Sequence, residues 1–421
     1  MKQPKAFALY PVLVLLGNVI ASQTFALKIG SFVNTYVAVA FEYMALGMVV
    51  YYTLTCYRRG WINVHALVVL LVLYNMLTIL RGYYIADGYW EWRNMMIVTT
   101  LALLAPLNIF LGGNPGFVKT ALRGFVRIVL PLAVVVALPM TISDKEDQLF
   151  ARCVTPIYFL VLFLPFFLRR KHQALVLAIA LASIFLAILF RSNMARIAAA
   201  FAIAALFWFY RHPPKAMLEV LRNILFFLPI VFFVLGATGV FNVLRMNDYI
   251  SWSSKTQDAD FNNKLKADNR TFLYAEVLSS VIKHDKALFG ESARGKYETI
   301  AFKYAYFKDG ADRFSSETGI LNLFLYGGIF AVLLNGLIFY FASWYAVCRS
   351  RNNLARALGL FITFRWLWMF IEEFTIYDMS YVFLWLMVGL CLSREFREMS
   401  DARVKAWINN IFYRKDRYKV I

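Results

Sequence analysis

Charged residues are scarce in this sequence, and their scarcity decides the solvent in which the chain folds. Asp, Glu, Lys and Arg make up 16% of the 421 residues, whereas 61% are hydrophobic and the mean hydropathy is +0.60. A soluble domain of this composition would expose large apolar patches to water. The composition therefore argues against a soluble globular protein and places the chain in a lipid bilayer.

Cysteine and histidine are rare as well, with four residues of each. The cysteines form no spacing motif, which argues against a disulfide framework and against a thiolate metal site. The histidines show no HExxH or similar ligand spacing, and the sequence has no glycine-rich phosphate loop. We therefore expect neither a metal ion nor a cofactor.

The sequence also lacks the alternating apolar and polar strands that are typical of a membrane β-barrel. It has continuous apolar runs instead, and a helix needs roughly 20 apolar residues to cross the hydrocarbon. The predicted fold class is an all-α polytopic membrane protein with twelve transmembrane helices. The spans are predicted at about residues 7–27, 33–55, 64–80, 94–111, 124–142, 153–168, 174–190, 197–210, 224–243, 318–345, 357–371 and 379–393.

The spans divide the chain into four parts: residues 1–243 with spans one to nine, a large polar loop at 244–317, spans ten to twelve at 318–393, and a tail at 394–421. Most Lys and Arg residues fall in every second connection and in the tail. The positive-inside rule then places both termini in the cytoplasm and the large loop outside. Because topology accounts for most of the +19 net charge, we expect no nucleic-acid partner.

The tail shows an amphipathic pattern. Apolar Val404, Trp407, Ile408, Ile411 and Phe412 recur at helical spacing among basic residues. This pattern predicts a helix that lies on anionic lipid headgroups at the cytoplasmic surface. A solvated charged tail is the alternative, because the apolar stripe is only about three turns long.

Three charges fall inside predicted spans: Glu42, Arg127 and Arg365. A charge at mid-span costs about 2.5–3.5 kcal/mol on insertion scales, so such a residue needs a partner or a role. Arg365 lies about two turns before Glu372 and Glu373, which makes a structural ion pair one expectation. Glu42 has two candidate partners, Arg127 and a cation from a loop.

Several arginines are predicted on the outer side of the membrane. Arg191 and Arg196 lie at the outer end of a span, and Arg270, Arg294 and Arg313 lie in the large loop. Each could be a simple headgroup anchor. Together they could bind one anion at bilayer depth, such as a lipid-linked diphosphate, because a guanidinium matches two phosphate oxygens at once.

The large loop has its own predicted structure. An amphipathic helix is predicted to begin near Arg270, followed by a turn at Gly290 and Gly295 and a second short helix around residues 297–307. The main apolar positions of the first helix are Leu273, Val277, Val281 and Leu288.

Three segments of the sequence resemble motifs of a known superfamily of membrane proteins. They are NMARIAA around Arg196, NRTFLYAEVL with Arg270 followed by LFGES at 288–292, and SSETGILNLFLYGGIFAVLL at 315–334. In this order, with one large loop before the last spans, the chain resembles the bacterial O-antigen polymerase and ligase superfamily. Ligases of that superfamily carry a His-Asn type signature where this chain has Glu317 and Thr318, so the chain is more similar to a polymerase.

The chain also departs from the pattern of that superfamily. Ala195 stands where the motif has Ser before its arginine, and neither Arg191 nor Arg270 is followed by a glycine eleven positions on. The identity of the sugars is therefore not inferred from the motifs.

The resemblance implies a GT-C-like glycosyltransferase that polymerises undecaprenyl-diphosphate-linked repeat units into a surface polysaccharide such as O-antigen. It implies an inverting, metal-independent reaction at the periplasmic face of the bacterial inner membrane. The partners would be a lipid-linked glycan donor and acceptor, membrane lipids and a chain-length regulator. The alternatives are a ligase of the same superfamily and a flippase of lipid-linked oligosaccharide.

The resemblance also suggests roles for individual residues. Arg196 and Arg270 would bind the diphosphate and stabilise charge in catalysis, with Arg191 and Arg313 as further diphosphate ligands. Glu317 would be the general base. As an alternative, Glu317 is a carboxylate that only favours a helix start.

His284, in the large loop, is the second candidate for the base. An ordinary exposed histidine is the alternative interpretation of this residue.

Overall fold

The structure, a computed structural model, describes residues 5–21, 31–143, 149–186, 191–210, 212–237, 269–298, 312–373, 375–413 and 416–418. Within these ranges the chain is helical apart from connections and one pair of two-residue strands. Seven of the described helices are long and apolar enough to cross a membrane. The chain is therefore an all-α membrane protein, as its composition predicts.

The first part of the chain forms helices where the apolar runs predict them. Two long rods, Tyr89–Gly112 and Pro115–Ile142, contain π-helical turns. In the second rod these turns precede Pro131 and Pro139, because a proline removes one N–H and crowds the carbonyl four residues earlier. The elements are η1 (Lys5–Leu9), α1 (Tyr10–Ile20), α3 (Ser31–Cys56), η2 (Arg59–Trp61), α4 (His65–Ile85), α5 (Tyr89–Asn94), η3 (Met95–Thr99), α6 (Thr100–Leu104), η4 (Ala105–Leu107), α7 (Asn108–Gly112), α8 (Pro115–Gly124), η5 (Phe125–Val129), α9 (Leu130–Leu132), η6 (Ala133–Ala137) and α10 (Leu138–Ser143).

The second part continues in the same way on both sides of the large loop. Each of the twelve predicted apolar stretches coincides with helix in the described residues, and those outside the seven long helices form shorter or broken ones. The elements are α11 (Leu149–Cys153), α12 (Ile157–Leu162), η7 (Leu164–Phe166), α13 (Arg170–Phe185), α14 (Arg191–Phe209), α15 (Lys215–Ala237), α18 (Asn269–Lys283), β1 (Tyr297–Glu298), β2 (Asp312–Arg313), α19 (Gly319–Cys348), α20 (Asn353–Met369), α21 (Met379–Leu392), α22 (Arg394–Glu398), α23 (Asp401–Asn409) and η9 (Asn410–Phe412).

Helix α21 is the centre of the bundle. All of its residues are buried, which agrees with a sequence that has no charge on any face. It packs against α7, α19 and α20. The crossing with α7 is close because Gly389 faces Gly112, and a Cβ at either position would meet the backbone of the other helix. Helices that are far apart in the sequence therefore pack around one buried helix.

At one end of the bundle, connections that are distant in sequence bind one another. Lys119 and Arg123 of α8 bind the carboxylate of Asp416 at 2.7 and 2.6 Å. Arg397 of α22 donates to the side chain of Asn63, which precedes α4. All of these segments are among those that the positive-inside rule predicts to be cytoplasmic.

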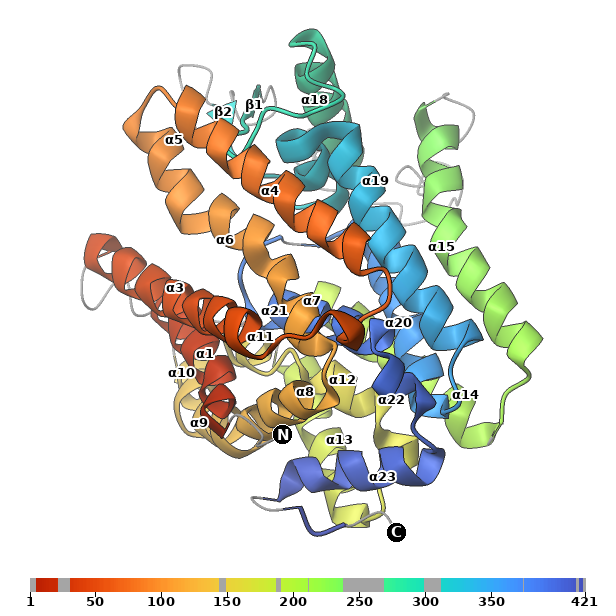
Figure 1. Cartoon of the computed structure of the whole chain (residues 1–421). Helices are drawn as coiled ribbons and strands as arrows, with labels where there is room; N and C mark the ends of the chain where they lie inside the picture. Colours follow the sequence, from red (N-terminus) through yellow and green to blue (C-terminus); the bar gives the residue numbers. More distant parts are fainter. Residues whose placement is uncertain are drawn as a thin grey trace, which may run out of the picture.

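At the other end of α4, the predicted outer segments meet. Arg81, near the end of α4, donates to the carbonyl oxygens of Phe289 and Gly290 in the large loop. Arg294 of the loop lies 3.4 Å from Glu91 of α5. In Figure 1 these loop segments gather with α18 at the end of the molecule opposite α23. Each of these contacts joins segments that the charge pattern predicts to lie on the same side of the membrane.

The tail packs in a way that the sequence does not predict. Val404, Trp407, Ile408 and Ile411 are buried within the protein, and the Trp407 indole donates to the carbonyl of Pro115 at 3.0 Å. The helix is amphipathic as predicted, but its apolar face covers the chain's own helices. The prediction that this face lies on lipid headgroups is therefore wrong.

Helix α19 is broken near the outer end of its course. Gly328 has φ 63° and ψ −161°, a conformation that is essentially restricted to glycine. The loop turn around Gly290, with φ 65°, fills the break, and backbone N–H groups on each side donate to carbonyls of the other. The four bonds are Ile329 to Ala287 (2.9 Å), Phe330 to Leu288 (3.3 Å), Glu291 to Leu325 (2.7 Å) and Ser292 to Tyr326 (3.0 Å). The non-helical backbone is thus satisfied by protein, as the bilayer requires.

The first helix predicted in the large loop is present. The second is predicted to begin near residue 297, where the chain is extended instead. In α18, Leu273, Val277 and Val281 are buried as predicted, whereas Leu288 lies beyond the helix and is exposed. Tyr297 is extended, and it pairs with Arg313 in the ribbon of β1 and β2. The prediction of a helix beginning there is wrong, and residues 299–311 lie outside the described part of the chain.

Candidate functional site

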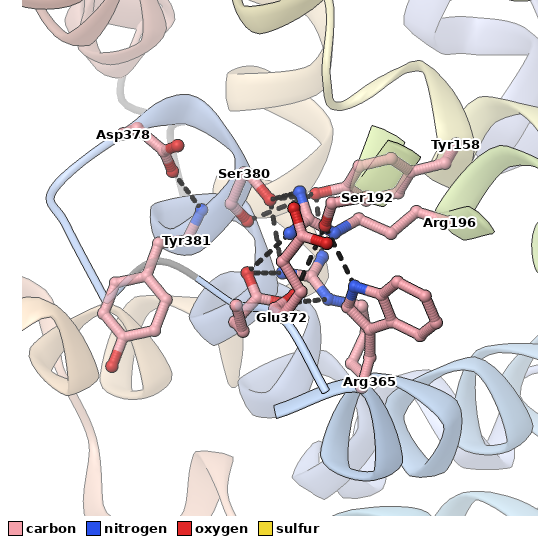
Figure 2. A network of polar contacts seen from close by, with 10 residues as sticks. Tyr158, Ser192, Arg196, Arg365, Glu372, Asp378, Ser380 and Tyr381 are labelled. Atoms are coloured by element: carbon pink, nitrogen blue, oxygen red, sulfur yellow. Dashed lines mark hydrogen bonds and ion pairs between the residues drawn. The ribbon is translucent and has the colours of Figure 1, made fainter. Parts of the chain in front are cut away.

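Arg196 and Arg365 converge on one buried carboxylate (Figure 2). Arg196 Nη2 lies 3.1 Å from Glu373 Oε1, and Arg365 binds both oxygens of Glu373 through Nη2 (2.8 Å) and Nε (3.1 Å). All three side chains are almost completely buried. The expectation that Arg365 pairs with a carboxylate two turns later is therefore confirmed, with Glu373 as the partner.

Polar groups from two further helices complete this cluster. Ser380 Oγ, at the start of α21, accepts from Arg196 Nη1 at 3.3 Å and from Arg365 Nη2 at 3.2 Å. The Tyr158 hydroxyl of α12 accepts from Arg365 Nη1 at 2.8 Å and lies 2.8 Å from Ser380 Oγ. We call Tyr158, Arg196, Arg365, Glu373 and Ser380 the arginine cluster. Four helices and the α20–α21 connection therefore meet at one polar centre.

The arginine cluster has one more positive than negative charge. Two guanidinium groups share the single carboxylate of Glu373, and Arg196 Nε is buried without a hydrogen-bond partner. An incompletely satisfied buried cation favours a nearby anion. The cluster therefore has the charge and the unused donor that an anionic ligand would need.

Asp378, in the connection before α21, is a further carboxyl group close enough to feel the charges of Arg196 and Arg365. Burial raises its pKa to about 6, against the opposing effects of the hydrogen bond from the Tyr381 backbone N–H and of the charge of Arg196. Asp378 is thus mainly ionised at neutral pH and loses its charge as the pH falls below about 6.

The two other predicted intramembrane charges lie elsewhere. Glu42 of α3 lies beside Asp378 and Asn18, whereas Arg127 is exposed on η5. Among the ion pairs of the described residues, none joins Glu42 to Arg127. The candidate pairing of Glu42 with Arg127 is therefore wrong.

The backbone of Glu317 is hydrogen-bonded to one member of the arginine cluster. Its carbonyl oxygen accepts from the backbone N–H of Glu373 at 3.2 Å. The side chain is half exposed and binds Arg313 at 3.3 Å. The predicted base and one predicted diphosphate ligand are therefore an ion pair, and they lie next to the residue that holds Arg196.

The other predicted site residues surround the same end of the bundle. Arg191 is exposed at the first position of α14, and Arg270 lies in the first turn of α18. The side chain of Arg270 lies outside the described part of the structure. One turn further along α18, the Tyr274 hydroxyl donates to the carbonyl of Phe370 at 2.7 Å, which places α18 over the end of α20. The fold thus brings these backbone positions toward Glu373.

His284 is placed differently. It lies in the turn after α18, and its Nδ1 is 3.1 Å from the carboxylate of Glu291. Glu291 belongs to the turn that fills the break in α19. The structure therefore connects His284 with the turn around Gly290 and not, by any described contact, with the arginine cluster.

Sequence reasoning missed two members of the cluster, Tyr158 and Ser380. Neither is charged, and both lie in apolar segments with no motif around them. The SYVF sequence at the start of α21 gives no signal beyond a helix start. The described residues also hold no group of three or more His, Cys, Asp or Glu side chains placed to share a metal ion.

Comparisons with known proteins add no relative to this description. No protein-family model matches the chain, and no curated protein or solved structure matches it. The functional argument therefore rests on the residues themselves.

Proposed function

We propose that the chain is a GT-C-like integral membrane glycosyltransferase that polymerises undecaprenyl-diphosphate-linked repeat units into a surface polysaccharide. The observation that carries this proposal is the convergence of Arg196 and Arg365 on Glu373, whose backbone N–H donates to the carbonyl of Glu317. A lipid diphosphate must place its charge near the membrane surface, where buried guanidinium groups bind phosphate oxygens strongly. A neighbouring carboxylate with access to solvent supplies the base that such a transfer needs.

The proposed reaction is an inverting displacement. Glu317 takes the proton of the acceptor hydroxyl, and the oxygen attacks the anomeric carbon of the donor glycan. The bond from that carbon to the diphosphate breaks, and the lipid diphosphate leaves with its electron pair. Arg196, with Arg191 and Arg270 nearer the surface, stabilises the charge that develops on it, at about 2.7–4 kcal/mol for a well-placed donor.

The ion pair between Arg313 and Glu317 suggests how binding prepares the base. The hydrogen bond from Arg313 Nη2 occupies Glu317 Oε1, an oxygen that would otherwise accept the proton of the acceptor hydroxyl. If Arg313 turns to the incoming diphosphate, it leaves Glu317 free to accept the proton. Substrate binding and activation of the base are then one event.

The same proposal includes a topology. The predicted twelve spans place the end with Lys119, Arg397 and Asp416 in the cytoplasm with both termini, and the end with α18 in the periplasm of a bacterial inner membrane. The arginine cluster then lies on the periplasmic side, where lipid-linked repeat units would be joined.

An assay with purified protein and lipid-linked repeat units tests the proposal. We expect glycan ladders without added lipid A core and without added divalent metal. Transfer that requires the core would identify a ligase instead. The absence of any transfer by a folded preparation would remove both enzymes from consideration.

One observation favours a second candidate, a flippase of lipid-linked oligosaccharide. Transporters often bind their substrates at broken membrane helices, and α19 is broken at Gly328. We rank this candidate second because the backbone groups at the break already bind the loop turn around Gly290. Transbilayer movement of a fluorescent lipid-linked glycan in proteoliposomes, without ladder formation, would support it.

A further inference from the structure

A cavity of about 490 Å³ lies at the end of the bundle opposite the arginine cluster. It is formed where η7, α13, α14, α20 and α23 meet, and its size is in the range of small-molecule sites. In Figure 1, α13 and α23 lie at this end, next to the C-terminus. The residues that line it are Pro165, Phe166, Gln173, Phe207, Trp208, His212, Asn353, Asp401 and Lys405.

The cavity lies at the level of the lipid headgroups. The last turn of α14 exposes Trp208 and Phe209, and Tyr210 follows it, with exposed fractions of 56%, 82% and 55%. Exposed aromatic residues at the end of an apolar helix are typical of the membrane interface. The side of the cavity that carries Trp208 is therefore next to lipid, and the lining elsewhere combines Pro165 and Phe166 with five polar or charged residues.

A hydrogen-bond relay decides which ring nitrogen of His212 can donate. Arg356 Nη1 donates to Asn353 Oδ1 at 3.2 Å, which turns the Asn353 amide nitrogen to His212 Nδ1 at 3.3 Å. Because an amide NH2 can only donate, His212 Nδ1 accepts, and the proton of the neutral ring is on Nε2. His212 Nε2 is thus a donor, and Lys405 supplies a second donor with a full positive charge.

Asp401 places a negative charge in the same cavity. Its Oδ1 accepts from the backbone N–H of Asn353 at 2.9 Å, which caps α20 and holds the carboxylate in place. The side-chain oxygen of Gln173 is a further acceptor. The nitrogen of the same amide group donates to the backbone carbonyl of Leu164 at 3.1 Å, which leaves the oxygen free. The cavity therefore offers donors and acceptors to the two ends of one ligand.

We propose that this cavity binds the head group of an aminophospholipid of the ethanolamine type. The phosphodiester binds Lys405 and His212, and the primary ammonium donates to Asp401 and Gln173. A trimethylammonium group cannot donate hydrogen bonds, and a glycerol head group has no positive charge to place beside Asp401. Phosphatidylethanolamine is therefore preferred over phosphatidylcholine and phosphatidylglycerol.

Native mass spectrometry of the full-length protein, with each of the three lipids added in detergent, tests the proposal. We expect phosphatidylethanolamine to bind at least about tenfold more tightly than the other two, a difference of about 1.4 kcal/mol. The variants Lys405→Gln and His212→Gln, alone and combined, should weaken the binding of all three lipids, because all three carry the phosphodiester. Lys171→Gln, which changes an exposed cation at the same end of α13, should bind them as the wild type does.

Asp401→Asn separates the ammonium site from the phosphate site. The asparagine oxygen still accepts from the Asn353 N–H, so the cap of α20 remains, but the charge is lost. We expect phosphatidylglycerol to bind this variant at least as tightly as phosphatidylethanolamine. Equal binding of the three lipids by the wild type, or an unchanged affinity of the double variant for phosphatidylethanolamine, would overturn the proposal.

Discussion

Arg196 and Arg365 donate to the same oxygen of Glu373, at 3.1 and 2.8 Å, from two different helices. The carboxylate is thus the common counter-ion of two buried cations and joins α14 to the α20–α21 connection. Its backbone N–H also binds the carbonyl of Glu317, so the segment that leaves the large loop rests on the same point. The position of the proposed base therefore depends on the residue that neutralises the arginines.

Glu373→Gln is expected to destabilise the protein. Glutamine leaves two buried guanidinium groups without a charged partner, and breaking a buried ion pair costs about 3–5 kcal/mol. Thermal unfolding in detergent measures the change. Glu395→Gln, which changes an exposed carboxylate of α22, is the control and should have an effect below about 0.5 kcal/mol. Equal stability of the two variants would show that Glu373 does not neutralise the arginines.

Arg191→Ala tests the diphosphate proposal without disturbing the core. Arg191 is exposed at the start of α14, whereas an alanine at Arg196 would also break a buried ion pair. We expect chain extension to slow by about tenfold to a hundredfold, because a hydrogen bond to a charged group is worth about 1.5–3 kcal/mol. The unfolding temperature should not change. Arg170→Ala, an exposed arginine at the first position of α13, is the control and should extend chains at the wild-type rate.

The local part of this architecture could be predicted from the sequence. Continuous apolar runs give the positions of the helices, and the spacing of Arg365 and Glu373 gives an ion pair because both lie near one helix end. Arg196 joins that pair only through tertiary packing, which no spacing in one sequence encodes. Ser380 and Tyr158 are equally invisible, since a single hydroxyl in an apolar run is compatible with ordinary packing.

The break in α19 and the packing of the tail could not be predicted, for two physical reasons. Gly327 and Gly328 lie inside an apolar run, and hydropathy does not report that φ of Gly328 is positive. The tail's apolar stripe would look the same on a lipid surface and on a protein surface. Burial of Trp407 against Pro115 decides between them only in the folded chain.

Gly328→Ala is expected to disrupt the junction between the large loop and the membrane helix. A Cβ there would collide with the carbonyl group of Leu288, and the backbone conformation alone costs a non-glycine residue about 1–3 kcal/mol. Hydrogen exchange should increase in residues 287–292 and 325–330. Gly47→Ala is the matched control, because a Cβ at Gly47 in α3 meets no atom within 4 Å. If Gly328→Ala leaves the hydrogen exchange of these residues unchanged, the interrupted backbone of α19 does not stabilise the turn around Gly290.

Glu317→Gln tests the proposed base. The substitution keeps the shape of a half-exposed side chain and its backbone contact with Glu373, but removes the proton acceptor. We expect chain extension to fall by about a hundredfold to ten-thousandfold, the usual contribution of a general base, with an unchanged unfolding temperature. Glu298→Gln, which changes an exposed carboxylate paired with Lys283, should leave the rate unchanged. Near-normal turnover of Glu317→Gln would make Glu317 a structural residue.

The raised pKa of Asp378 predicts how the stability of the protein depends on pH. Its pKa is raised by burial from the ordinary 3.8 to about 6, so between these values the folded protein binds a proton that the unfolded chain does not. The contribution of this group to stability is therefore greatest below about pH 4 and is lost as the pH rises to about 6. Asp378→Asn can still cap α21, because its oxygen accepts from the Tyr381 N–H, and it has no charge to bury.

The unfolding temperature of Asp378→Asn relative to the wild type should therefore rise between pH 4 and pH 6 and then stay constant. Differential scanning calorimetry at constant ionic strength measures this difference. Asp285→Asn, which removes an exposed carboxylate from the turn after α18, should give a difference that varies less with pH. A relative stability of Asp378→Asn that falls as the pH rises would mean that Arg196 and Arg365 outweigh burial and that Asp378 is a full counter-ion of the arginine cluster.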